Sequence, residues 1–152
     1  LEQTAKYIDS YLRPLEDISI TGSMISNYVK KKIINNPVKK QYGRDQIAAL
    51  IFIAIAKSVL SLDNIHMMFE IQRQTYDNAT AYNYFCSEFE LILHHVFELD
   101  QANAKTGAAH NVKKEHGTFS NEKTMLRNMI ITVAHKIYLD RYFSLLRDED
   151  TI

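Results

Sequence analysis

Proline, glycine and cysteine are scarce in this chain of 152 residues, which has two prolines, four glycines and one cysteine. So few residues that break helices and form turns favour helices over a β-sandwich or a β-barrel. The single cysteine, Cys86, excludes an internal disulfide framework and is typical of a protein of the reducing cytoplasm. We therefore expect an all-α fold and a cytoplasmic location.

Long hydrophobic runs are also missing. The longest apolar segment, residues 47–56, has ten residues, whereas a helix needs about 20 to cross a bilayer. No basic segment followed by an apolar stretch and small residues opens the chain, so no secretory signal is predicted. With an ordinary hydrophobic fraction of 46%, the composition predicts a globular protein without a membrane partner.

Acidic residues are absent from one stretch, residues 18–44, although the whole chain carries 18 acidic and 18 basic side chains. The stretch holds six cations, which are Lys30, Lys31, Lys32, Lys39, Lys40 and Arg44. A local charge of +6 within a neutral protein is typical of a surface that binds nucleic acid. A lysine cluster that merely faces water is the alternative explanation.

The first part of this basic stretch has the pattern of a short amphipathic helix. Thr21 is its predicted N-cap, because the hydroxyl can accept a hydrogen bond from the amide of Ser23 or Met24. One polar face recurs at helical spacing and consists of Ser23, Ser26, Asn27, Lys30 and Lys31. Hydroxyls and an amide come first and ammonium groups follow, which suits a helix that reads base edges and then contacts phosphates.

Five further segments have apolar residues at helical spacing and are predicted to be helices. They begin near residues 3, 45, 62, 79 and 122, and the last two extend to about residues 99 and 147. The segment near residue 45 is apolar nearly all round, which predicts a central buried helix rather than a strand. Ser61 and either Ser120 or Asn121 are predicted N-caps. Residues 101–121 are polar, contain two glycines and are predicted to be a loop.

The order of these segments resembles that of MerR-type winged helix-turn-helix proteins. In that family a recognition helix with a tyrosine precedes a turn with proline, a basic wing that ends in Arg-x-Tyr-Ser-x-Asp/Glu-Asp/Gln, an apolar helix and a Ser-Leu-x-x-Ile helix. The corresponding segments here are 27–29, 32–37, 40–46, 47–60 and 61–65.

Residues 24–53, MISNYVKKKIINNPVKKQYGRDQIAALIFI, are more similar still to a family of uncharacterised bacterial proteins, mostly from low-GC Gram-positive bacteria, that is itself regarded as MerR-like. That family typically reads Met-Ile-Asn-Asn-Tyr-Val-Lys and then Lys-x-Tyr-Ser-Arg-Glu-Gln. Here Ser26 replaces one asparagine and Gly43 replaces the serine. Compared with MerR proteins, Ser26 and Asn27 stand in place of an arginine, and the wing is about half as long, too short for a full β-hairpin.

The resemblance implies a MerR-like helix-turn-helix head with a reduced wing, expected in residues 1–75, and a DNA-binding transcription regulator. Residues 76–152 are expected to form a C-terminal helical pair that completes the core and joins two copies in a homodimer. Base edges would be read by Ser23, Ser26 and Asn27. Phosphates would be held by Lys30, Lys31, Lys39, Lys40 and Arg44, while Tyr42 either binds a phosphate or packs the arm.

Two other functions fit the same residues. The missing arginine and the short wing also suit a protein–protein interaction module that has kept the fold and lost DNA binding. Alternatively, the aromatic residues between positions 76 and 97 could line a pocket for a small effector, as in ligand-sensing regulators. Aromatic residues at helical spacing more often belong to a core or a dimer interface.

Enzymatic activity, a cofactor and a metal site are not predicted. His94 and His95 are adjacent on a helix, so their side chains diverge by about 100° and do not readily bind one ion. Cys86 has no histidine and asparagine companions that the sequence singles out, and Glu88 and Glu90 face different sides of a helix. Glycine-rich nucleotide-binding loops and the nucleophile-elbow motif are absent.

Overall fold

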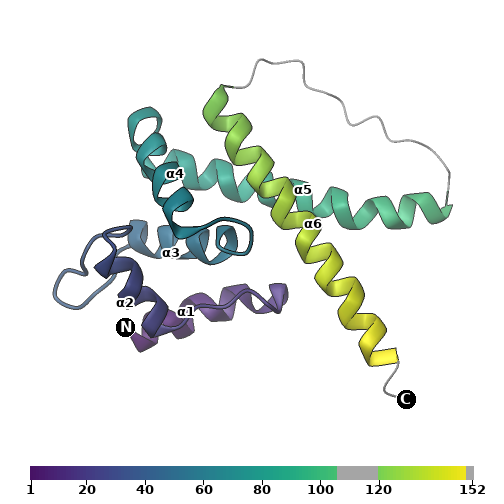
Figure 1. Cartoon of the computed structure of the whole chain (residues 1–152), viewed down its shortest axis with the longest axis horizontal. Helices are drawn as coiled ribbons and strands as arrows, with labels where there is room; N and C mark the ends of the chain where they lie inside the picture. Colours follow the sequence, from purple (N-terminus) through teal and green to yellow (C-terminus); the bar gives the residue numbers. More distant parts are fainter. Residues whose placement is uncertain (106–119, 150–152) are drawn as a thin grey trace. The chain divides into compact units, whose positions relative to one another are not determined.

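The computed structural model describes residues 1–105 and 120–149, with side chains for residues 1–98 and 120–149. In these residues the fold is all-α, as predicted, with six α-helices, one 3₁₀ turn and no strand (Figure 1). The elements are α1 (Glu2–Leu12), η1 (Arg13–Leu15), α2 (Gly22–Lys30), α3 (Arg44–Ala56), α4 (Leu62–Thr75), α5 (Asn78–Lys105) and α6 (Asn121–Glu149). Two compact units meet inside α5, between Asn83 and Tyr84, whereas the sequence placed the division after residue 75.

Side-chain caps begin the helices where the sequence predicts them. The hydroxyls of Thr21, Ser61 and Ser120 each accept a hydrogen bond from the backbone amide three residues later, at 3.2, 3.2 and 3.3 Å. Asp77 caps α5 in the same way, because its Oδ1 accepts from the amide of Thr80 at 2.7 Å. Each cap satisfies a backbone N–H that the first turn of a helix leaves without a partner.

One predicted helix boundary, the end of α5, is wrong. α5 continues to Lys105, so residues 101–105 are helical and do not belong to the predicted loop. These five residues, Gln-Ala-Asn-Ala-Lys, include good helix formers and no glycine, so nothing in them ends the helix. The rest of the predicted loop, residues 106–119, lies outside the described residues. α6 ends at Glu149, close to the predicted end near residue 147.

The first unit is built around α3, which is half-buried from Gln46 and mostly buried from Leu50 to its end. Its buried residues are Leu50, Phe52, Ile53, Ala54, Ile55 and Ala56. α1 packs against both α2 and α3, and Phe69 of α4 contacts Phe52 with 5.4 Å between ring centroids. Since a helix without a polar face is stable in water only when neighbours cover it, α3 determines where these helices lie. The prediction of a buried central helix is confirmed.

A hydrogen bond joins α1 to the segment that leads into α2. Oδ1 of Asp9 accepts from the backbone amide of the buried residue Ile20 at 2.8 Å. From there α2 turns Ile25 and Tyr28 into the core, which fixes its rotation about its own axis. The polar face of α2 therefore lies on the opposite, outward side.

In the second unit, α5 and α6 run in the same direction. Near the beginning of α6 and of the part of α5 that belongs to this unit, Nζ of Lys123 lies 5.1 Å from the ring centroid of Tyr84. Further along both helices, the rings of Phe97 and Tyr138 are 5.6 Å apart. A short loop joins antiparallel helices, but helices that run in parallel need a connection long enough to return to the start.

We predict that Leu50→Ala destabilises the protein by about 2–5 kcal/mol, because it opens a cavity in a fully buried site of α3. The control is Met67→Ala on α4, where the side chain is 63% exposed and the expected change is under about 0.5 kcal/mol. Urea unfolding followed by circular dichroism measures both changes. Equal effects of the two substitutions would show that α3 is not the centre of the core.

A second prediction concerns acid. Hydrogen bonds from the amide and the hydroxyl of Thr80 stabilise the carboxylate of Asp77 and hold its pKa below the usual value of 3.8. The cap therefore contributes stability that is complete above that value and lost as the pH falls through the lower folded pKa. Asp77→Asn keeps a capping oxygen but does not ionise, so it should flatten this part of the stability–pH curve. Urea unfolding between about pH 2 and 5 measures it, with Asp63→Asn in α4 as the control.

Candidate nucleic-acid interface

The polar face of α2 is exposed along its whole length. Every member of the predicted set, Ser23, Ser26, Asn27, Lys30 and Lys31, has an exposed side chain. In the described part of the chain, none of the six cations of residues 18–44 forms an ion pair with a carboxylate. Within the described residues, the positive charge of this stretch is therefore not neutralised by acidic side chains.

α2 ends in a Schellman-type cap that turns the chain sharply. The amide of Lys32 donates to the carbonyl of Val29 at 3.0 Å, and the amide of Ile33 donates to that of Tyr28, also at 3.0 Å. Lys32 has a φ of 57°, in the left-handed region where glycine is the usual residue. Ile33 is buried directly after it, so the turn leaves an exposed cation between a helix and a core residue.

Residues 38–41 form a minimal hairpin in the loop between α2 and α3, which extends from the helices of the first unit (Figure 1). Val38 and Gln41 exchange both backbone hydrogen bonds, at 3.1 and 2.9 Å. The two residues between them, Lys39 and Lys40, have φ values of 50° and 63°, as a type I′ turn requires. The arm predicted as a reduced wing is thus a hairpin with a single β-bridge.

The backbone of this hairpin does not favour lysine. Asn-Gly and similar pairs usually occupy a type I′ turn, because a left-handed conformation costs other residues about 1–2 kcal/mol each. Lys39 and Lys40 nevertheless form the turn, and both side chains are exposed. Together with Lys32, three of the six cations are held in a conformation that costs conformational energy.

Gln46 in the first turn of α3 holds the base of this loop. Its side-chain NH₂ donates to the carbonyls of Asn35 and Asn36 at 2.9 and 3.0 Å, and its Oε1 accepts from the amide of Gly43 at 2.7 Å. These bonds attach the residues before and after the hairpin to the same helix. The sequence analysis did not assign this role to Gln46, although a glutamine three residues after an N-cap has the spacing of a capping box.

The remaining residues of the loop divide into exposed and packed ones. Arg44 begins α3 and is exposed, whereas Tyr42 is half-buried. Val38 was not predicted as a site residue. At 73% exposed, it is the most exposed large apolar side chain in the described residues, and it lies next to the two turn lysines. The hairpin and the first residue of α3 therefore present three cations, Lys39, Lys40 and Arg44, and one apolar side chain, Val38, to solvent.

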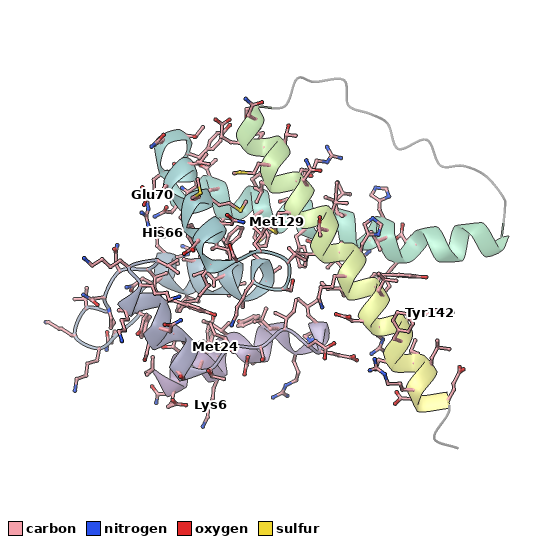
Figure 2. All side chains as sticks on the ribbon, viewed as in Figure 1. Lys6, Met24, His66, Glu70, Met129 and Tyr142 are labelled. Carbon is pink, nitrogen blue, oxygen red and sulfur yellow. The ribbon has the colours of Figure 1, made fainter. Side chains whose placement is uncertain are left out.

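The described residues give less support to a metal site, to a charged site on α4 or to a membrane-spanning helix. Histidine, cysteine and carboxylate side chains form no group of three or more there that could hold a metal ion. His66 on α4 lies one turn before Glu70, with 3.5 Å between Nε2 and Oε1 (Figure 2). Glu70 also accepts a hydrogen bond from Arg73 at 2.9 Å, so its carboxylate already has a cationic partner on the surface of the same helix. None of the helices described here is both long and apolar enough to cross a bilayer.

Fold and surface together define an all-α protein whose first unit carries a cationic surface on a short helix and a hairpin. A family described as a domain of unknown function, DUF1836, matches residues 1–85, which is more than half of the chain, so the protein belongs to this family. The matched region contains every residue of the candidate interface. No curated protein and no solved structure matches the chain.

We predict that Lys40→Gly stabilises the protein by about 1 kcal/mol, because glycine adopts a positive φ without steric cost. The matched control is Lys31→Gly, which removes the same charge at a residue with a φ of −78°. At position 31 glycine only increases the flexibility of the unfolded chain, so the free energy of unfolding should fall by about 0.5–1 kcal/mol. Urea unfolding at fixed ionic strength measures both, and changes of the same sign would contradict the prediction.

Proposed function

We propose that this protein is a MerR-like, DNA-binding transcription regulator of bacterial type that contacts the duplex with α2 and the 38–41 hairpin. One observation carries the proposal. The six cations of residues 18–44 lie on an exposed helix and loop, and within the described structure none is paired with a carboxylate. Such a surface binds a polyanion most favourably, because each phosphate that a lysine or arginine neutralises releases counterions.

The dimensions of α2 suit the major groove. An α-helix with its side chains is about 10–12 Å across, which fits the groove width of about 12 Å, and the nine residues of α2 give it a length of about 13 Å. In the proposed complex, the side chains of Ser23, Ser26 and Asn27 donate to and accept from base edges. Lys30 and Lys31, at the other end of the same face, then reach the phosphates that border the groove.

The first turn of α2 is assigned to bases rather than to phosphates for a second reason. The carboxylate of Glu2 lies so close to Gly22 that a Cβ on this glycine would collide with it. A carboxylate at this end of a helix interacts favourably with the positive end of the helix dipole. A phosphate would have to displace Glu2, so we assign phosphate binding to the lysine end of α2 and to the hairpin.

The lysines of the hairpin support an ionic function. Glycine or asparagine at positions 39 and 40 would relieve the backbone, and the hairpin keeps two ammonium groups there instead. With Arg44 at the start of α3, they provide three cations that a phosphate backbone can contact. Gln46 restricts the motion of the loop that presents them, which lowers the entropy lost on binding.

A protein-interaction module is the second candidate. The exposed side chain of Val38 favours it, because an apolar contact beside cations also suits an acidic protein surface. The two candidates differ in the partner that they require, and a duplex of random sequence distinguishes them directly.

We predict that the full chain binds random duplex DNA in a salt-dependent manner and that Lys39→Glu with Lys40→Glu weakens binding on the order of 50-fold at 0.1 M salt. The loss of two phosphate contacts should also reduce the slope of log K against log salt by about 2. Fluorescence anisotropy with a labelled duplex measures both quantities.

The control variant combines Arg13→Glu with Arg73→Glu. It changes the net charge by the same amount, but both side chains lie on the first unit outside the basic stretch. If net charge alone governed binding, the two double variants would lose affinity equally, and the proposed interface would be wrong. Absence of duplex binding by the unmodified protein would favour the interaction module.

A further inference from the structure

α6 has two apolar stripes in successive halves of the helix. The first consists of buried residues, which are Met129, Ile130, Val133 and Ala134. The second consists of large side chains that are 39–51% exposed, which are Leu139, Tyr142, Phe143, Leu145 and Leu146. With about 100° of rotation per residue, the centres of the two stripes lie roughly 180° apart around the helix.

The two halves of α6 therefore carry their apolar residues on opposite sides of the helix. The side of α6 that is buried in the first half continues in the second half with Asp140, Ser144 and Asp148. A helix that packs against a single core keeps its apolar residues on one side throughout. The second stripe, which we call the 139–146 face, faces away from the side on which the first half is buried.

Aromatic contacts make the 139–146 face continuous. Tyr142, on the second half of α6 (Figure 2), contacts Phe143 with 5.7 Å between ring centroids and stacks on Tyr138 at 6.5 Å. Tyr138 in turn contacts Phe97 of α5 at 5.6 Å. Contiguous exposed apolar surface of this kind marks interaction sites, and aromatic residues are enriched in the centres of protein interfaces.

The charged residues around the 139–146 face indicate which kind of partner binds it. Residues 136–149 contain three cations and three anions, so this half of α6 does not attract DNA or an anionic membrane by net charge. By helical register, Asp140, which pairs with Lys136 one turn earlier, and Arg147 border one side of the face, and Arg141 and Asp148 border the other. A two-fold contact places the same surface against itself, so mixed charge on both borders allows opposite charges to meet.

We infer that the 139–146 face is the contact between two copies of this chain. Five large side chains, each about half exposed, offer on the order of 400 Å² per protomer, which is about half of a standard interface. The homodimer is accordingly weak, with a dissociation constant in the micromolar range or above. The inference deepens the proposed function by placing two heads on one duplex, but its test needs no DNA, so the two can fail separately.

Sedimentation velocity of the full chain from about 5 to 300 µM tests the inference, because this range brackets a micromolar dimer. The unmodified protein should pass from monomer to dimer across the range. Tyr142→Asp should weaken the dimer at least about tenfold by placing a charge in the centre of the face. Ser87→Asp adds the same charge at an exposed position of α5 and should leave the association unchanged.

Leu139→Gln, at the other end of the face, provides a second variant of smaller chemical change and should also weaken the dimer. Because both substituted side chains are exposed in the monomer, far-UV circular dichroism should show unchanged helix content. A protein that remains monomeric at the highest concentration would overturn the inference. So would a dimer that Tyr142→Asp and Leu139→Gln leave as tight as Ser87→Asp does.

Discussion

Burial of α3 is the interaction on which the first unit depends. Each fully buried leucine or isoleucine of this helix contributes about 1.5–3 kcal/mol, whereas an exposed charge interaction contributes at most about 1 kcal/mol. The core can therefore tolerate a surface with six cations and no acidic residue between positions 18 and 44. Because α3 has no polar side of its own, the polar contacts that this unit makes with a partner have to come from α2 and from the loop before α3. Gln46 connects the two requirements, since it belongs to the buried helix and holds the base of the exposed loop.

The cationic surface also contains three residues in an unfavourable backbone conformation. Lys32, Lys39 and Lys40 have positive φ values at positions where glycine or asparagine is the usual residue. Strained residues of this kind persist when the surrounding structure compensates for them, and they gather at functional sites. In this unit the compensation comes from a Schellman cap, a hairpin bridge and the Gln46 clamp, all made by backbone groups or by one amide side chain. The proposed DNA contact gives these lysines a function that glycine cannot perform.

Local patterns predicted much of the fold. Thr21, Ser61 and Ser120 cap helices as expected, because a cap involves only residues three positions apart. The outward face of α2 followed from periodicity alone, and the burial of α3 followed from a segment that is apolar nearly all round. The extension of α5 through residues 101–105 was missed, since a polar composition was read as a loop although the residues favour a helix. The clamp by Gln46 was missed because its acceptors lie ten and eleven residues away.

By itself, the sequence determined the helical class, the separation of charge and the sides of α2 that face inward and outward. These properties follow from composition and from periods of three to four residues, which the chain carries whatever its tertiary structure. Only the folded protein decided that two lysines form a type I′ turn, that α5 and α6 run in the same direction, and that only the first apolar stripe of α6 is buried. The turn was not foreseen because lysine does not favour its left-handed backbone. The other two depend on which distant residues come into contact, and hydrophobic periodicity within one helix carries no information about its neighbours.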